Sequence, residues 1–158
     1  QMLSKFQEVP LLTHGGTAYV QSNAILLYLA EHYSIFGGST LDKLEKCREW
    51  LFWESNKIGL SLLQLRYAAK FAPDEYNQGA LDWLSVRFAQ DINVIEQELS
   101  DGRNFILGDE ITIADFSLCG YLYFAAQANL DVPPMTSQWL EHISNLNGWK
   151  HPYQLLSE

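Results

Sequence analysis

Residues 8–33 constrain the fold more than any other stretch, because they predict two strands and a helix in direct succession. Two short β-prone runs, Val9 to Leu12 and Thr17 to Val20, flank His14-Gly15-Gly16. Glycine takes the positive φ that a tight turn requires, so these runs predict an antiparallel hairpin. Ser22 then opens an apolar pattern at helical spacing and is expected in the N-cap region. The stretch therefore predicts a ββα unit.

The rest of the chain predicts helices only. Residues 34–39, which include two glycines, predict a linker. An apolar stripe at three-four spacing predicts one long helix from Leu41 to about Phe71, ended by Pro73. A second long helix is expected from Glu75 or Gly79 to Ser100, where Asp101-Gly102 stops it. Shorter helices are predicted at 113–126, 136–145 and 149–156.

The helix expected from residue 113 has the clearest start signal in the chain. Thr112 as N-cap and Asp115 three residues later form an Asp version of the capping box. Ile111 and Phe116 occupy the two ends of a hydrophobic staple around it. The helix that follows is apolar almost all the way round, which predicts the buried centre of a bundle.

Composition indicates an ordinary globular protein. A chain of 158 residues, 47% of them hydrophobic, buries about 68–70% of its unfolded surface and needs no disulfide or metal to hold its core. The formal net charge of −9 repels nucleic-acid phosphates and anionic membrane surfaces, so we expect neither as a partner. No apolar run approaches the ~18 residues of a membrane span, and no signal peptide is visible. We expect a cytoplasmic protein.

The residues most often used in metal and redox chemistry show no ligand pattern. Cys47 and Cys119 lie far apart within apolar helical patterns, which predicts no disulfide and a reducing compartment. The histidines have no metal-ligand spacing, and no zinc motif, phosphate loop or nucleophile elbow appears. We therefore expect no metal at any of the four histidines, His14, His32, His142 and His151.

Taken in order, these features resemble the glutathione transferases, in particular the bacterial type. Val9-Pro10 leads the hairpin, Gln21-Ser22 opens the first helix, and a linker, a long helical pair and the capping box follow. The C-terminal motif fits too, with Trp139-Leu140-Glu141 and Gly148 through Tyr153. The resemblance implies a mainly α fold: a partial thioredoxin-like ββα domain over residues 1–34, and the all-helical C-terminal domain over residues 41–158.

The same resemblance implies a site for glutathione, the expected substrate. Pro10 would be the cis-proline that turns the Val9 backbone toward the cysteinyl backbone of glutathione. Gln21 and Ser22 would bind the γ-glutamyl carboxylate, and a helix N-terminus favours an anion. Taken alone, Pro10 also fits a turn or strand-edge proline, and Ser22 a plain N-cap.

A second group of residues has two interpretations. Trp53, Asn56 and Tyr67 share one face of the predicted long helix with Leu60, through i+3, i+4 and i+7 relations. Within the family these side chains would line a pocket for the electrophile. Alternatively, they pack between helices or against a second subunit.

The family's thiol-activating Ser, Cys or Tyr lies upstream of every motif in this sequence, so we expect no catalytic residue here. The intact protein is expected to conjugate glutathione to a small electrophile and to form a homodimer, as the family does. This chain alone is expected to be inactive, because a strand-helix-strand unit of about 30 residues would have to be supplied. The alternative is a non-catalytic interaction or ligand-binding module.

Overall fold

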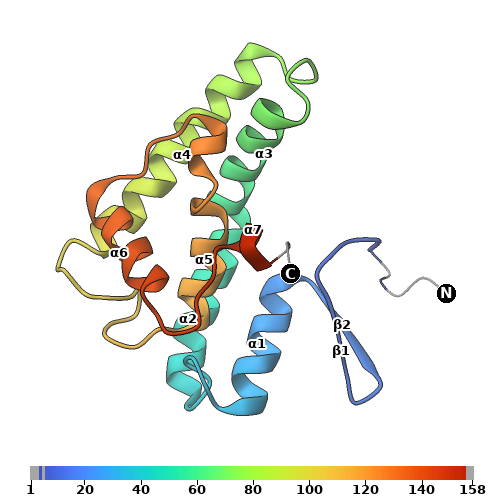
Figure 1. The fold of residues 1–158 in the computed structure, drawn as a ribbon, viewed down its shortest axis with the longest axis vertical. Helices are drawn as coiled ribbons and strands as arrows, with labels where there is room; N and C mark the ends of the chain where they lie inside the picture. Colours follow the sequence, from blue (N-terminus) through green and yellow to red (C-terminus); the bar gives the residue numbers. More distant parts are fainter. Residues whose placement is uncertain (1–3, 5, 156–158) are drawn as a thin grey trace.

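The computed structural model of the protein describes Ser4 and residues 6–155 and is mainly helical, as the sequence predicts. Figure 1 shows a hairpin at one side of a helical bundle. The elements in chain order are β1 (Leu11–His14), β2 (Thr17–Val20), α1 (Ser22–Tyr33), α2 (Leu41–Asn56), α3 (Ile58–Lys70), α4 (Gln78–Glu98), α5 (Ile113–Leu122), the 3-10 helix η1 (Ala125–Ala128), α6 (Pro134–Ser144) and α7 (Pro152–Leu155).

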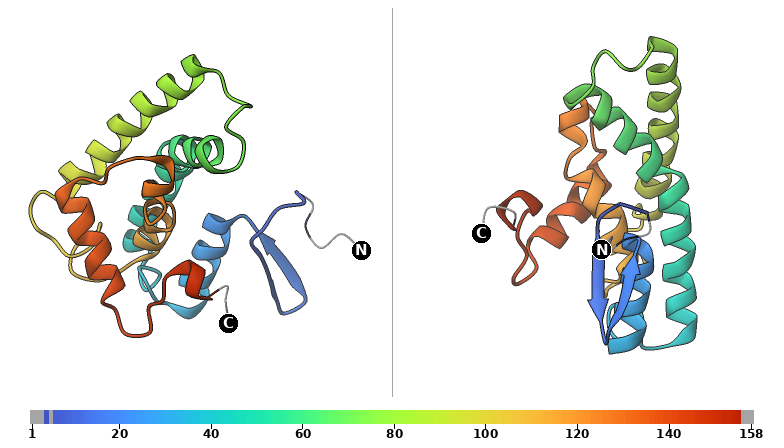
Figure 2. Two further views of the ribbon diagram at one scale, coloured as in Figure 1. Left: turned by 45° about the horizontal axis from the view of Figure 1, so that its top comes forward. Right: turned by 90° about the vertical axis from the view of Figure 1, so that its right-hand side faces the viewer.

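The predicted hairpin is present. Strands β1 and β2 pair antiparallel, with Leu11 opposite Val20, and Gly15 and Gly16 take the positive φ angles of the turn. The hairpin lies beside α1 (Figure 2). The other edge of β1 has no strand partner among the residues that the structure describes.

The predicted linker is a closely packed joint between α1 and α2. The carbonyl of Phe36 accepts from the backbone N–H of Ile113 at 3.0 Å, which ties the joint to the start of α5. Gly38 lies so close to α1 that a side chain there would collide with the backbone carbonyl of Ala30. Glycine is required at this position because the two backbones touch.

The prediction of one long helix from Leu41 to Phe71 is wrong, because the helix breaks at Lys57. Lys57 has φ −121° and ψ −102°, and its carbonyl accepts the first backbone bond of α3 from Leu60. In a continuous helix Leu60 would instead donate to the carbonyl of Asn56. That carbonyl accepts from Arg87 of α4 at 3.4 Å, so a tertiary contact takes up the group that the break leaves free.

Helix α5 is the centre of the bundle, as predicted, and packs against α1, α2 and α3. Its capping box is present: the Thr112 hydroxyl accepts at the helix start, and the Asp115 carboxylate accepts from the Thr112 N–H at 2.8 Å. Ile113, Leu118 and Leu122 are almost completely buried. The helix ends at Leu122 rather than near residue 126, and η1 continues the chain after a turn.

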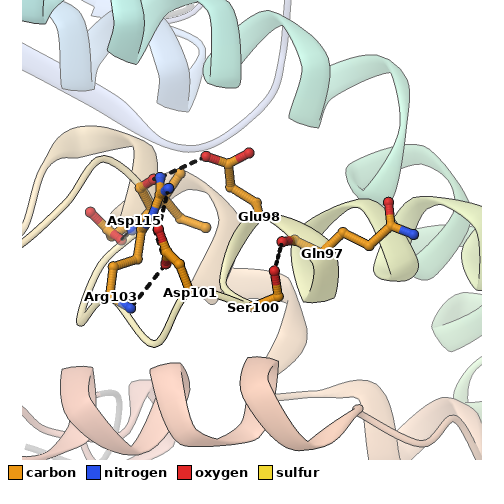
Figure 3. Close-up of polar contacts among 7 residues, drawn as sticks. Gln97, Glu98, Ser100, Asp101, Arg103 and Asp115 are labelled. Atoms are coloured by element: carbon orange, nitrogen blue, oxygen red, sulfur yellow. Dashed lines mark hydrogen bonds and ion pairs between the residues drawn. The ribbon is translucent and has the colours of Figure 1, made fainter.

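The loop between α4 and α5 is held by Arg103. Its guanidinium donates to Glu98 at 2.7 Å and to Asp101, and Figure 3 shows these three side chains converging near Asp115. It also donates to the carbonyl of Ile106 at 3.2 Å. Helix α4 ends at Glu98, slightly before the stop that the sequence predicts at Asp101-Gly102.

The start of α6 depends on a carboxylate from another helix. Glu96 of α4 accepts from the backbone N–H groups of Met135 and Thr136 at 3.0 and 2.8 Å, and from the Thr136 hydroxyl at 2.8 Å. Helix α6 therefore begins at Pro134, before the predicted position. Helix α7 begins at Pro152 rather than Trp149, and its predicted end at residue 156 lies outside the described residues.

Candidate functional site

The segment before β1 and the start of α1 lie next to each other. The Val9-Pro10 peptide bond is cis, and Val9 is 92% exposed. The Gln21 amide donates to the Glu8 carboxylate at 2.9 Å. The fold therefore brings the two predicted motifs, Val9-Pro10 and Gln21-Ser22, to one place.

The N-terminus of α1 is open. Gln21 occupies the N-cap position with φ 74° and ψ 119°, and no side chain caps the helix. Ser22 is the first helical residue rather than the N-cap, which corrects the sequence prediction by one position. The first N–H groups of a helix have no intrahelical partner and carry partial positive charge. An exposed hydroxyl beside them suits an anionic ligand group.

A cavity of about 470 Å³ lies directly against this helix start. Four helices contribute to its wall, and its lining is more apolar than polar. The residues that line it include Gln21, Ser22 and Leu27 of α1, Leu51, Phe52 and Glu54 of α2, Gly59, Leu60, Leu63 and Gln64 of α3, and Tyr121 of α5.

The three residues suggested for an electrophile pocket do not line this cavity. Trp53 packs edge to face on Trp50 and lines a separate hollow toward α4. Asn56 is exposed at the end of α2, and Tyr67 is 45% exposed on α3. The break at Lys57 is the physical reason, because the predicted spacing assumed one continuous helix.

A buried polar network that the sequence pattern did not predict lies against the cavity, which two of its residues, Asn23 and Glu54, line. The Asn23 amide donates to Glu54 Oε2 at 2.7 Å and to the Leu51 carbonyl at 2.9 Å. Ser117 donates to the same Glu54 oxygen at 3.0 Å and to the Asn23 side-chain oxygen at 2.8 Å. The network links α1, α2 and α5.

Glu54 is only half satisfied by this network. The residue is 2% exposed, and its Oε1 has no hydrogen-bond partner among the described residues. Burial raises the pKa of Glu54, although the bonds from Asn23 and Ser117 oppose the shift. Burial and the nearby Glu54 charge also raise the pKa of Tyr121 across the cavity. This oxygen is itself closed to solvent, so the cavity borders a buried and incompletely bonded carboxyl group.

Comparisons with known proteins agree with this architecture. Residues 78–154 match the family model for the glutathione S-transferase C-terminal domain. A glutathione S-transferase structure from Xanthobacter autotrophicus Py2 matches 98% of this chain and 77% of its own, at 28% identity and a TM-score of 0.83. Glutathione S-transferase F10 of Arabidopsis thaliana is 25% identical over 160 residues, covering 94% of this chain and 74% of its own. Together these comparisons support a member of the glutathione S-transferase family.

The fold extends to a glutathione transferase from Burkholderia graminis that holds two glutathione molecules per subunit. The match covers 92% of this chain and 66% of the chain in that structure, with a TM-score of 0.80 and 23% sequence identity. The chain spans less than two thirds of the length of several other curated glutathione S-transferases.

Neither cysteine of this chain is placed to act as a thiolate. Both are free and buried. Burial raises the pKa of Cys47, and it raises the pKa of Cys119 to about 12. Because the thiolate is the reactive form, these two thiols are inert at neutral pH.

The histidines take part in ordinary packing and hydrogen bonds. His14 bonds the Tyr28 hydroxyl at 2.6 Å and contacts the ring of His32. His142 lies near the carbonyl of Asn104, and His151 packs among aromatic rings at the C-terminal end. No group of three potential ligands that could hold a metal occurs within the described part of the chain. Within that part, no helix is both long and apolar enough to cross a bilayer.

Proposed function

We propose that this chain provides the glutathione-binding part of a transferase that conjugates glutathione to small electrophiles. The observation that carries the proposal is the open N-terminus of α1 at Gln21-Ser22, beside a cavity and hydrogen-bonded to the segment that precedes the cis Val9-Pro10 bond. The family membership gives the ligand its identity.

In this proposal, the two charged groups of the γ-glutamyl residue and the cysteinyl backbone of glutathione each have a partner in the chain. Its carboxylate binds at the Gln21-Ser22 helix start, where N–H groups and partial positive charge favour an anion. The exposed Val9 backbone, next to Pro10, pairs with the cysteinyl backbone. The charge of Glu54, beside the cavity, attracts the γ-glutamyl ammonium group without a direct bond, because its unpaired oxygen is closed to solvent.

The proposal assigns no thiol-activating residue to this chain. Glutathione conjugation needs a group that stabilises the thiolate, and both cysteines have raised pKa values and lie buried. We expect such a group to come from outside the described residues, because the family's activating residue lies upstream of every motif in this chain. The chain alone is expected to bind glutathione without turning it over.

A homodimer is part of the proposal. Helices α2 and α3 carry large exposed apolar side chains: Phe52, Leu60, Leu63 and Tyr67, each 39–69% exposed. Soluble monomers rarely leave such a set uncovered. Sedimentation velocity of the chain would measure its oligomeric state, and a monomer at high micromolar concentration would contradict this part of the proposal.

The test of the binding site is isothermal titration of glutathione into the chain and two serine variants. Ser22→Ala removes a hydroxyl from the proposed carboxylate site, and a lost bond to a charged group costs about 1–3 kcal/mol. We therefore expect roughly 5-fold to 150-fold weaker binding. Ser85→Ala is the matched control, because Ser85 is exposed and bonds only its own helix, at the Leu81 carbonyl. Unchanged affinity in Ser22→Ala would remove Ser22 from the site.

The second candidate is a non-catalytic glutathione-binding module, which the inert thiols favour. Assay of glutathione conjugation to an activated aryl halide separates the two. Turnover by the intact protein supports the transferase, whereas retained glutathione binding with no turnover supports the module.

A further inference from the structure

Three hydrogen-bond donors converge on one phenol oxygen where α3, η1 and α7 meet. Lys70 Nζ and Arg66 Nη2 lie 3.1 and 3.2 Å from the Tyr153 hydroxyl oxygen. The Gln127 amide donates to the same oxygen at 3.1 Å. The bond from Gln127, followed by those from Lys70 and Arg66, lowers the pKa of Tyr153 to about 8. This arrangement favours a negatively charged oxygen.

The two cations in this cluster are unusual for an acidic protein. The formal net charge is −9, and the other ion pairs join a basic side chain to Asp or Glu. Within the described part of the chain, neither Arg66 nor Lys70 has a carboxylate partner. Their positive charge is met only by a phenol and an amide, so it remains available to an anion.

Aromatic rings border the cations. The Arg66 guanidinium lies 4.4 Å from the centre of the Phe124 ring, and Lys70 Nζ lies 5.7 Å from the centre of the Phe71 ring. Phe71 is 59% exposed and Tyr153 is 44% exposed, so a ligand reaches the cluster from solvent. Stacked cations and rings together suit a planar anion.

The cluster continues one face of α3 beyond the cavity described above. Leu63 lines that cavity, and Arg66 and Lys70 follow it at i+3 and i+7. Residues at this spacing share a helix face, and a rise of 1.5 Å per residue places the two cations about 5–10 Å further along the helix.

We propose that Arg66, Lys70 and Tyr153 form a binding site for the carboxylate of an aromatic acid, with the ring held against Phe71 and Phe124. The carboxylate oxygens accept from Arg66 and Lys70, beside the phenol oxygen on which these donors converge. The site goes beyond the proposed glutathione site and does not depend on it, because it is built from different residues.

The experiment compares 4-nitrobenzoate with 4-nitrobenzamide, which share the ring and differ in the charge. Each is titrated against the full chain by ligand-observed NMR at pH 7 without glutathione. We expect the acid to bind about 5-fold to 10-fold more tightly, as one charge-assisted bond implies. Equal affinity for the two compounds, or no binding of either, would overturn the proposal.

Variants locate the site. Lys70→Gln, at an exposed position, and Arg66→Gln should each remove most of the preference for the acid. Lys46→Gln is the matched control, because Lys46 is also an exposed lysine but pairs with Glu49 at 2.8 Å. It should keep the full preference. An equal loss in Lys46→Gln and Lys70→Gln would mean that the acid responds to overall charge only and would reject the site.

Discussion

Two buried carboxylates on neighbouring helices differ in how completely they are bonded. Asp115 at the start of α5 is fully buried, and both of its oxygens are occupied. Oδ1 accepts from the Ile106 N–H and the Trp139 indole at 2.8 and 2.9 Å, while Oδ2 accepts from the N–H and hydroxyl of Thr112. Glu54 is almost as buried, but its Oε1 has no partner among the described residues.

This difference in hydrogen bonding distinguishes Asp115, which has a structural role, from Glu54, which lies beside the candidate binding site. Asp115 joins the loop after α4, the cap of α5 and helix α6 in one bonded unit, although burial still raises its pKa. Glu54 bonds with one oxygen only and lines the cavity. A buried charge that is fully bonded holds a fold together, whereas a half-bonded one lowers stability and leaves a negative charge next to the cavity.

The largest effect is expected from Asp115→Asn. The new amide nitrogen must face two donors, whichever way it is turned, and a buried network then loses at least two charge-assisted bonds. The free energy of unfolding should fall by about 3–5 kcal/mol, measured by urea denaturation. Asp131→Asn, at an exposed aspartate, should leave stability unchanged. A loss below about 1 kcal/mol in Asp115→Asn would show that Asp115 is not the structural hub.

A smaller loss is expected from Trp139→Phe, which removes only one of the donors to Asp115. Trp139 is 1% exposed, so the change also leaves a small void. Together these effects should cost about 1–3 kcal/mol. Trp83→Phe is the matched control, because Trp83 is 55% exposed. Equal urea midpoints for wild type and Trp139→Phe would mean that Asp115 does not need the indole bond.

The smallest effect, and one of opposite sign, is expected from Glu54→Gln. Because burial raises the folded-state pKa of Glu54, the ionised carboxyl lowers stability. That cost is absent below the unfolded pKa of about 4.3 and fully present above the raised folded value. Glu54→Gln should therefore match wild type near pH 4 and be more stable than wild type at pH 7.5, with the difference growing as the pH rises through the folded-state pKa. Urea unfolding at the two pH values measures this.

The Glu54→Gln variant also tests the proposed role of Glu54 in glutathione binding. If the charge of Glu54 attracts the γ-glutamyl ammonium group, Glu54→Gln should weaken glutathione binding while it stabilises the fold. Glu49→Gln, at an exposed glutamate, is the control for both measurements. A loss of stability as large as that of Asp115→Asn would erase the distinction between the two carboxylates.

Features set by neighbouring residues were predictable from sequence. The hairpin turn, the start of α1 and the Thr112–Asp115 cap each depend on residues within a few positions of one another. The break at Lys57 was not predictable, because the freed Asn56 carbonyl is taken up by Arg87, thirty-one positions away. The spacing of Trp53, Asn56 and Tyr67 failed as a guide to a shared pocket for this reason.

The network around Glu54 was missed although one signal was present. Leu44, Cys47 and Leu51 precede Glu54 at three-four spacing, and Ile58 follows it, so a charged residue lies on the buried stripe. Its partners Asn23 and Ser117 come from distant segments, and no local pattern connects them. Pattern reasoning could have found the buried charge but not its partners.

The close contact at Gly38 has a practical consequence for dividing this protein. A boundary drawn in the joint between α1 and α2 would separate segments whose backbones touch, and it would uncover the core face that Ala30 occupies at 1% exposure. A shortened protein that starts at Leu41 would lack α1, and the core surface that Ala30 covers would then be exposed to water. The ββα unit and the helical bundle are therefore best expressed, crystallised and mutated as one piece.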